Sequence, residues 1–275
     1  MKNLTSENNP ASIHHDETQG QYAKVQCVFV HGWGMNSAVW DSFINQLPDF
    51  IEPLCIDLPG HGQFNQLGFE SLQDLVDHLL LHADKRLTGP AIWVGWSLGA
   101  LPVLALARQQ PEKVRALCLL ASNPCFVVRA DWQAAVEESV FDLFADNLQQ
   151  NIEKTLQRFL SLQVRGMAES RDVLRLLRAA IVGQGLPSSA ALASGLAVLK
   201  STDLRATLGA LAVPQYWLLG EHDSLVPAAL NDYLGVQAGV KSHIIDGAAH
   251  LPFVSHPEDV MQQLLSIIDV NRIHD

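Results

Sequence analysis

Apolar residues along the chain gather in short runs that are typical of buried strands. Between most of these runs, apolar residues recur with a helical period, as in residues 72–83 and 98–109. This alternation predicts an α/β fold in which helices cover both faces of a mostly parallel sheet. The predicted strands are residues 25–30, 53–56, 91–94, 114–120, 215–219 and 242–245.

Residues 131–200 interrupt this alternation, because their apolar pattern is helical throughout and includes no convincing strand. A helical block between two strands predicts a lid over one end of the sheet. We therefore expect an α/β core of residues 25–125 and 201–275 and a helical lid of residues 126–200. A polar N-terminal leader, residues 1–24, lacks the apolar segment of a secretory signal peptide.

One apolar run, residues 92–107, is broken by the sequence GWSLG at 95–99. A GxSxG motif is a weak signal alone, but here a predicted strand leads into it and a predicted helix follows. That setting is typical of a nucleophile elbow, a strained turn that presents a serine at the N-terminus of a helix. We predict that Ser97 is a nucleophile. The plainer interpretation is an ordinary strand-to-helix turn.

A nucleophilic serine needs a base, a partner for that base, and donors that stabilise an oxyanion. Strand-like runs precede Asp223 and His250, as one precedes Ser97. The order Ser97, Asp223, His250 along the chain is the order of the triad in elbow hydrolases. We predict that His250 takes the serine proton and that Asp223 orients and stabilises its imidazole. The predicted oxyanion donors are the backbone amides of Trp33, in a loop after the first strand, and of Leu98.

Other ionisable residues lie near these positions, and each has a plainer interpretation. His256 precedes Pro257 and a helix, where a capping or surface role is expected. Asp246 is too near His250 in sequence to brace its ring. Glu221 and His222 adjoin Asp223 but are expected to point elsewhere, and His31 and His61 are expected to pack within Gly-rich loops.

Composition narrows the possible functions. The chain has 275 residues, of which 48% are hydrophobic and 17% charged, as expected for one large α/β domain or two small ones. A net charge of −11 argues against a general nucleic-acid binder. No apolar run reaches the ~18 residues that cross a membrane. The four cysteines form no CxxC pair, so we expect reduced thiols and no metal site.

Five motifs are spread over nearly the whole chain after the leader. They are HGWG at 31–34, DLPGHG at 57–62, GWSLGA at 95–100, GEHDSLVP at 220–227 and the loop of His250. Together they resemble the motifs of the α/β-hydrolase fold family. The resemblance implies a mostly parallel sheet with an inserted helical lid, and serine hydrolase activity without a metal or organic cofactor.

Some segments support a narrower resemblance. These are HGWGMN, GWSLG, ASNPCF at 121–126, RFLSLQ at 158–163 and AAHLPFVSHP at 248–257. They are similar to the pimeloyl-[acyl-carrier protein] methyl ester esterases of biotin synthesis. That family implies a cytoplasmic monomer acting on an acyl carrier protein that carries the methyl pimeloyl group. It also implies a substrate site formed by Trp33, Ser97, Leu98, Phe159, Leu160, Ser161, Leu162, Gln163 and His250.

The predicted lid is basic although the chain is acidic. Six basic and three acidic side chains lie between residues 150 and 180. Helical spacing places Lys154 with Arg158 on one face and Arg171 with Arg175 on another. Such faces can steer an acidic partner, and the resemblance suggests one, because acyl carrier proteins are acidic. We predict carrier docking at these four residues; the plainer interpretation is a solvated helix face.

Two other activities would use the same catalytic residues. One is a broad-specificity short-chain carboxylesterase, and the other is a carbon–carbon bond lyase or hydrolase on the same fold. A binding module without activity is less consistent with the sequence, because it does not need a complete triad. Comparing carrier-bound with free esters, and identifying the products, separates these alternatives.

Overall fold

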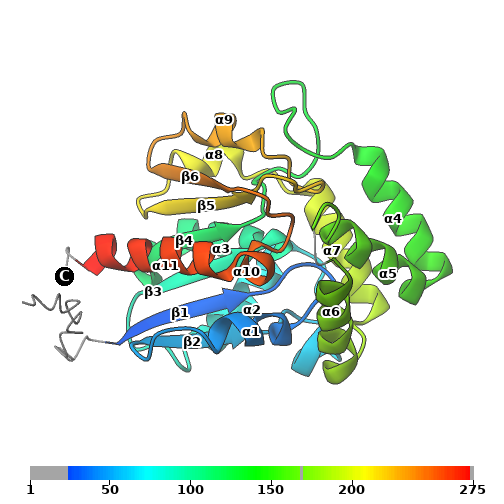
Figure 1. Ribbon diagram of the computed structural model, residues 1–275, viewed down its shortest axis with the longest axis horizontal. Helices are drawn as coiled ribbons and strands as arrows, with labels where there is room; N and C mark the ends of the chain where they lie inside the picture. Colours follow the sequence, from blue (N-terminus) through cyan, green and yellow to red (C-terminus); the bar gives the residue numbers. More distant parts are fainter. Residues whose placement is uncertain (1–23, 168–169, 273–275) are drawn as a thin grey trace, which may run out of the picture.

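The computed structural model describes residues 24–167 and 170–272, which contain one six-stranded sheet (Figure 1). Its strands are parallel, in the order β2-β1-β3-β4-β5-β6. β1 and β4 have the predicted bounds, and the other strands are one or two residues longer than predicted. The bounds are β1 Val25–Val30, β2 Ile51–Ile56, β3 Ala91–Trp96, β4 Val114–Leu120, β5 Gln215–Gly220 and β6 Val240–Ile245. The predicted leader lies outside the described residues except for Lys24.

Helices cover both faces of the sheet, so the prediction of an α/β fold is confirmed. α2 (Leu72–Ala83) and α3 (Ala100–Gln109) pack on one face, and α11 (Pro257–Arg272) packs on the other (Figure 1). In β1, Val28 belongs to the first apolar cluster and Phe29 to the second. Burial of both faces explains why the central strands read as continuous apolar runs. The shorter core helices are α1 Asp41–Ile44, α8 Arg205–Leu208, α9 Leu230–Leu234 and α10 Pro252–Ser255.

The strand order determines where a site can form. After β1 the chain adds β2 on one side, and it then places β3 on the other side of β1. Open α/β sheets bind ligands outside the carboxyl ends of the strands, at the point where the winding direction reverses. The HGWG motif follows β1 and the serine of GWSLG follows β3, so both motifs lie at this point.

Between β4 and α8 the chain forms four helices, which lie at the carboxyl end of the sheet (Figure 1). Three of them contribute residues such as Phe144, Phe159 and Leu192 to the same apolar cluster as β1 and α2. Because core and lid share this cluster, the division into separate units stays a prediction. Within the described ranges, no helix has both the length and the apolar character needed to span a membrane. The bounds are α4 Glu138–Gln150, α5 Ile152–Gln163, α6 Ser170–Gln184 and α7 Ser189–Ser201.

The prediction of helix from residue 131 onward is wrong for residues 131–137. The first lid helix begins at Glu138, and the preceding segment forms two isolated bridges, Val127 with Val136 and Arg129 with Trp132. Trp132 and Ala134 are buried, whereas the residues on either side of Trp132 are exposed. This alternation has the period of an extended chain rather than that of a helix.

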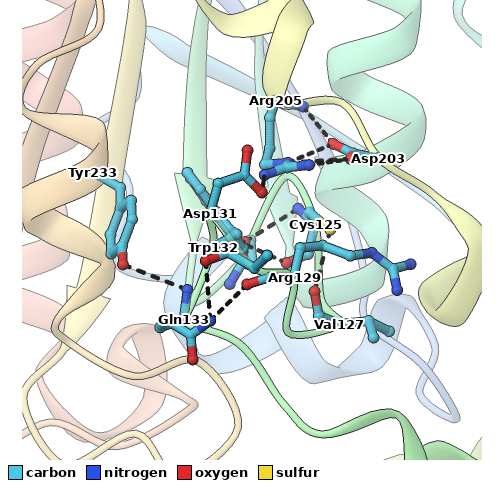
Figure 2. A network of polar contacts seen from close by, with 11 residues as sticks. Cys125, Val127, Arg129, Asp131, Trp132, Gln133, Asp203, Arg205 and Tyr233 are labelled. Atoms are coloured by element: carbon cyan, nitrogen blue, oxygen red, sulfur yellow. Dashed lines mark hydrogen bonds and ion pairs between the residues drawn. The ribbon is translucent and has the colours of Figure 1, made fainter.

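Arg205 fastens this segment to the core (Figure 2). Its guanidinium bonds Asp131 at 2.7 Å and Asp203 at 2.7 Å, and its Cζ lies 5.5 Å from the centre of the Trp132 ring. The Trp132 indole in turn donates to the Asn123 side chain at 3.0 Å. A charged group that bridges two carboxylates and an aromatic face ties the chain entering the lid to α8.

We expect Arg205→Met to lower the free energy of unfolding by about 1–2 kcal/mol, because it removes the ion pairs and the cation–π contact. Urea denaturation followed by circular dichroism measures the change. Arg108→Met is the matched control, since Arg108 is exposed on α3, and it is expected to shift stability by less than about 0.5 kcal/mol. Equal effects of the two substitutions would contradict the role assigned to Arg205.

Candidate active site

Ser97 lies in a strained turn directly after β3. Its φ is 53°, in the left-handed region that residues with a side chain rarely adopt. A Cβ at position 95 would lie 2.6 Å from Ala100 Cα, and a Cβ at position 99 would lie 2.5 Å from the His31 carbonyl oxygen. Only glycine fits these two positions, because any side chain there would clash with neighbouring backbone. The turn therefore holds the serine against the end of β1.

The three residues predicted as a triad meet at the carboxyl end of the sheet. His250 Nδ1 lies 2.7 Å from Asp223 Oδ2, and His250 Nε2 lies 3.0 Å from Ser97 Oγ. The second Asp223 oxygen accepts the amides of Leu225 at 2.8 Å and Val226 at 2.9 Å. Because the carboxylate accepts the Nδ1 proton, Nε2 is left as the acceptor for the serine hydroxyl.

The backbone of His250 is held from both sides. The Trp96 indole donates to the His250 carbonyl at 2.8 Å, and the His250 amide donates to the Gln163 carbonyl at 3.3 Å. Trp96 precedes the nucleophile, and Gln163 ends α5 of the lid. Neither contact could be predicted from the sequence, because nothing in the spacing of Trp96, Gln163 and His250 indicates that they meet.

The other ionisable residues near the triad take no part in this relay. Glu221 and His222 have half-exposed side chains, and a Glu221 oxygen accepts the Gly247 amide at 2.8 Å. His256 Nδ1 bonds the neighbouring Ser255 hydroxyl at 2.8 Å, and Asp246 is exposed. Each residue agrees with its plainer interpretation.

The HGWG loop, residues 31–34, lies directly against the serine. A Cβ at Gly32 would be 3.2 Å from Ser97 Cβ, so the next amide, that of Trp33, is close to the nucleophile. Leu98 stands in the first turn after Ser97, where backbone N–H groups have no partner within the helix. These two amides can therefore donate to an oxyanion formed at Ser97.

The indole of Trp33 joins this loop to the lid. Its Nε1 donates to the Leu192 carbonyl of α7 at 2.8 Å, and its ring meets that of Phe159 edge-on at 4.7 Å. A Cβ at Gly195 would lie 2.6 Å from Trp33 Cδ1, so α7 leaves room for the indole only because residue 195 is glycine. The lid and the HGWG loop therefore pack directly against each other.

The structure brings only part of the predicted acyl segment to the site. Phe159, Leu160 and Gln163 are buried, Phe159 against Trp33 and Gln163 beside His250. Leu162 is partly buried. Ser161 is exposed, and its hydroxyl donates to the Gln157 carbonyl of its own helix. Helical geometry turns Ser161 away from the face that carries Phe159, so it does not join the site.

Gln163 has a buried amide side chain. It is 1% exposed, and neither its nitrogen nor its oxygen bonds any group in the described part of the chain. A buried amide without partners carries a desolvation cost that a polar ligand group can relieve. The role of the Gln163 side chain in substrate binding stays a prediction.

No group of three His, Cys, Asp or Glu side chains in residues 24–167 and 170–272 is placed to hold a metal ion. The four cysteines are free thiols. Cys27 and Cys118 are buried, and burial raises the pKa of the Cys27 thiol to about 12, which disfavours the reactive thiolate.

Comparison with known proteins places this arrangement in a family. The model of the alpha/beta hydrolase family matches residues 27–263. The chain belongs to the alpha/beta hydrolase family. Solved structures of an esterase from Exiguobacterium antarcticum and a bromoperoxidase from Bacillus anthracis share the fold of this hydrolase. Their TM-scores are 0.78 and 0.82 at 18% and 15% identity, and each alignment covers 90% of this chain and 92% of the other.

Sequence relatives of this hydrolase are more similar. A protein of Methylococcus capsulatus is 40% identical over 243 residues, which are 88% of this chain and 93% of the relative. A protein of Yersinia pestis is 37% identical over 248 residues, covering 89% and 93%, and one of Pectobacterium carotovorum is 37% identical over 251 residues, covering 91% and 96%. All three are named pimeloyl-[acyl-carrier protein] methyl ester esterase.

Buried histidines brace the HGWG loop of this hydrolase. His31 Nε2 accepts the Leu58 amide at 2.9 Å, and its other ring nitrogen donates to the Gly32 carbonyl at 2.8 Å. His61 packs on His31 with ring centres 5.1 Å apart, and His78 donates to the Asp57 carbonyl at 2.9 Å. Burial lowers the pKa of His61 to about 3 and that of His78 to about 4. These rings are neutral where an unfolded chain binds protons.

We expect the stability of the hydrolase to fall as the pH drops below the unfolded-state histidine pKa of ~6.5, because only the unfolded state gains protons. Each such group contributes up to about 1.4 kcal/mol per pH unit until its folded-state pKa is reached. Urea denaturation between about pH 7.5 and pH 5 measures the slope, and His78→Gln should reduce it.

The control for this experiment is His243→Gln, since His243 is exposed on β6. That substitution should leave the slope unchanged. A slope that His78→Gln does not reduce would show that His78 is not a source of the acid sensitivity.

Proposed function

We propose that this protein is a serine carboxylesterase that hydrolyses the methyl ester of pimeloyl-[acyl-carrier protein], releasing pimeloyl-[acyl-carrier protein] and methanol in biotin synthesis. The observation that carries the proposal is the relay from Asp223 through His250 to Ser97, with distances of 2.7 Å and 3.0 Å. A buried relay of this kind activates a serine hydroxyl for attack on a carbonyl.

In the first half-reaction, Ser97 Oγ attacks the carbonyl carbon of the methyl ester while His250 Nε2 takes the hydroxyl proton. The carbonyl oxygen becomes an oxyanion that accepts hydrogen bonds from the Trp33 and Leu98 amides. The tetrahedral intermediate collapses, and His250 returns the proton to the leaving methoxide. The products of this step are methanol and an ester of Ser97 with the pimeloyl group.

In the second half-reaction, water attacks this acyl-enzyme with His250 again as the base. The same amides stabilise the second oxyanion, and Ser97 leaves with the proton that His250 returns. Asp223 stabilises the imidazolium in both steps. The overall reaction consumes one ester and one water and yields one carboxylic acid and one methanol, so it needs no redox partner.

The burial of the nucleophile favours a substrate whose ester group is attached to the carrier through a long, flexible chain. Ser97 is 4% exposed and His250 is 1% exposed beneath the lid. A folded protein cannot approach them, whereas an acyl chain on a flexible carrier arm can. The aromatic wall of Trp33 and Phe159 suits the aliphatic part of such a chain, and the names of the sequence relatives supply the identity of the ester.

The carrier is proposed to dock on the basic lid. Lys154 and Arg158 are exposed on α5, and Arg171 and Arg175 are exposed on α6. Arg175 pairs with Asp172 at 3.1 Å, but both side chains are more than 70% exposed, and such a pair exchanges partners at little cost. These residues can attract an acidic carrier to a protein whose net charge is −11. A cytoplasmic monomer remains part of the proposal.

Ser97→Ala should abolish hydrolysis of methyl pimeloyl carrier protein and of free methyl esters while leaving the fold intact, because it removes only the attacking oxygen. The measurement is kcat/KM on both substrate classes, with methanol and pimeloyl-carrier quantified as products. A wild-type preference for the carrier-bound ester supports the proposal. A preference for free short-chain esters would support a broad carboxylesterase, and products without methanol would support carbon–carbon bond chemistry.

Arg158→Glu with Arg171→Glu should raise KM for the carrier-bound ester by roughly tenfold and leave free esters unaffected, since the charges contact only the carrier. Raising the salt concentration should reduce the difference. The control pair is Lys85→Glu with Arg86→Glu, because both residues are exposed on the core between α2 and β3. Equal losses on both substrates, or equal losses in the control, would argue against docking at the lid.

A further inference from the structure

An open apolar groove runs between α5 and α6 of the lid. Its volume is about 450 Å³, and Leu156, Leu160 and Ile181 line it. Val182 and Leu186 line it as well, with 76% and 47% of their surface exposed. Apolar side chains gathered at an exposed hollow are typical of a surface that binds another molecule.

One basic residue lines this groove, and two more lie on the same stripe of α6. Arg178 lines it, and helical spacing places Arg171, Arg175 and Val182 on the same stripe of α6, since they lie seven, three and four residues from Arg178. Arg171 and Arg178 have no ion partner among the described residues. Glu153 of α5 is the acidic side chain that lines the groove. The exposed Val182 therefore lies on the basic stripe of α6 and not on its buried apolar face.

The floor of the groove reaches the catalytic loop. A Cβ at Gly34, the last residue of the HGWG loop, would lie 2.9 Å from Leu156 Cδ2. Leu156 lines the groove on one side and touches this loop on the other. A molecule held in the groove therefore lies one side-chain layer from the loop that bears the Trp33 amide.

We propose that this groove seats an apolar side chain from an acidic helix of the carrier protein, between the arginine stripe and α5. The inference rests on the proposed function and adds to it an apolar anchor beside the charged contacts. A partner that fits must be acidic, to complement the stripe, and must offer an apolar residue for the hollow. Eight residues line the groove, whereas a stable dimer interface takes roughly 20–30 residues from each partner, which argues against a second copy.

The two kinds of contact have different consequences. Charge pairs at the rim raise the rate of association and are screened by salt. An apolar side chain buried in the groove slows dissociation and is not weakened by salt. The groove therefore allows docking to persist at high salt, which the arginines alone cannot do.

The test is binding of acyl carrier protein to the Ser97→Ala protein, measured by calorimetry, with and without Val182→Ser. Loss of the apolar contact should weaken binding roughly three- to tenfold. The same ratio should persist at about 1 M salt, where the screening length is ~3 Å. In the active enzyme, Val182→Ser should raise KM for the carrier-bound ester and leave free methyl esters unchanged.

Val236→Ser is the matched control, because Val236 is a valine with 79% exposure that lies beyond α9 of the core, outside the lid. It should change neither binding nor KM. If Val182→Ser binds the carrier as tightly as Val236→Ser does, the carrier does not bind in the groove. In that case, hydrolysis of the carrier-bound ester by the enzyme would still support the proposed function.

Two further outcomes would overturn the inference in other ways. A ratio that vanishes at high salt would mean that docking here is purely electrostatic. A concentration-dependent dimer in light scattering that Val182→Ser dissociates would assign the groove to a second copy. If the wild type neither binds the carrier nor hydrolyses the carrier-bound ester, both the proposed function and the proposed carrier site in the groove are wrong.

Discussion

The close approach of the turn after β3 to the end of β1 is the contact on which the site depends. Gly99 lies against the His31 carbonyl, and Gly95 lies against Ala100, so the chain packs at distances that no side chain would allow. This contact brings the strained Ser97 beside the HGWG loop, and thus a nucleophile beside a backbone amide. The parallel sheet makes it possible, because neighbouring strands end at the same edge.

The lid is part of this machinery and not only a cover. The last residue of α5, Gln163, accepts the amide of His250, and the Trp33 indole bonds the Leu192 carbonyl of α7. The loops that bear the base and the proposed oxyanion donor therefore each carry one hydrogen bond to a lid helix. A partner that moves α5 or α7 would shift groups at the reacting centre, which gives docking on the lid a direct physical route to catalysis.

The charge of the lid differs from that of the rest of the molecule. The chain is acidic overall, yet arginines without ion partners among the described residues lie on α6 beside exposed Val182 and Leu186. Leaving arginines unpaired and valine exposed contributes nothing to folding. Both features are consistent with a surface that binds a partner. The buried histidines near His31 and the ion pairs of Arg205 have a different role, because they hold the HGWG loop and the segment before α4 in place.

The sequence by itself determined the strands, the α/β class and the order of Ser97, Asp223 and His250, because burial periodicity and glycine-bounded turns are local properties. It misjudged residues 131–137, where an alternating segment forms bridges with residues 127–129 directly before it instead of a helix. Only the tertiary structure decided which side chains and carbonyls meet: Trp96 and Gln163 on His250, and Ser161 turned outward. Such contacts join residues more than 80 positions apart, and no local pattern encodes a partner at that separation.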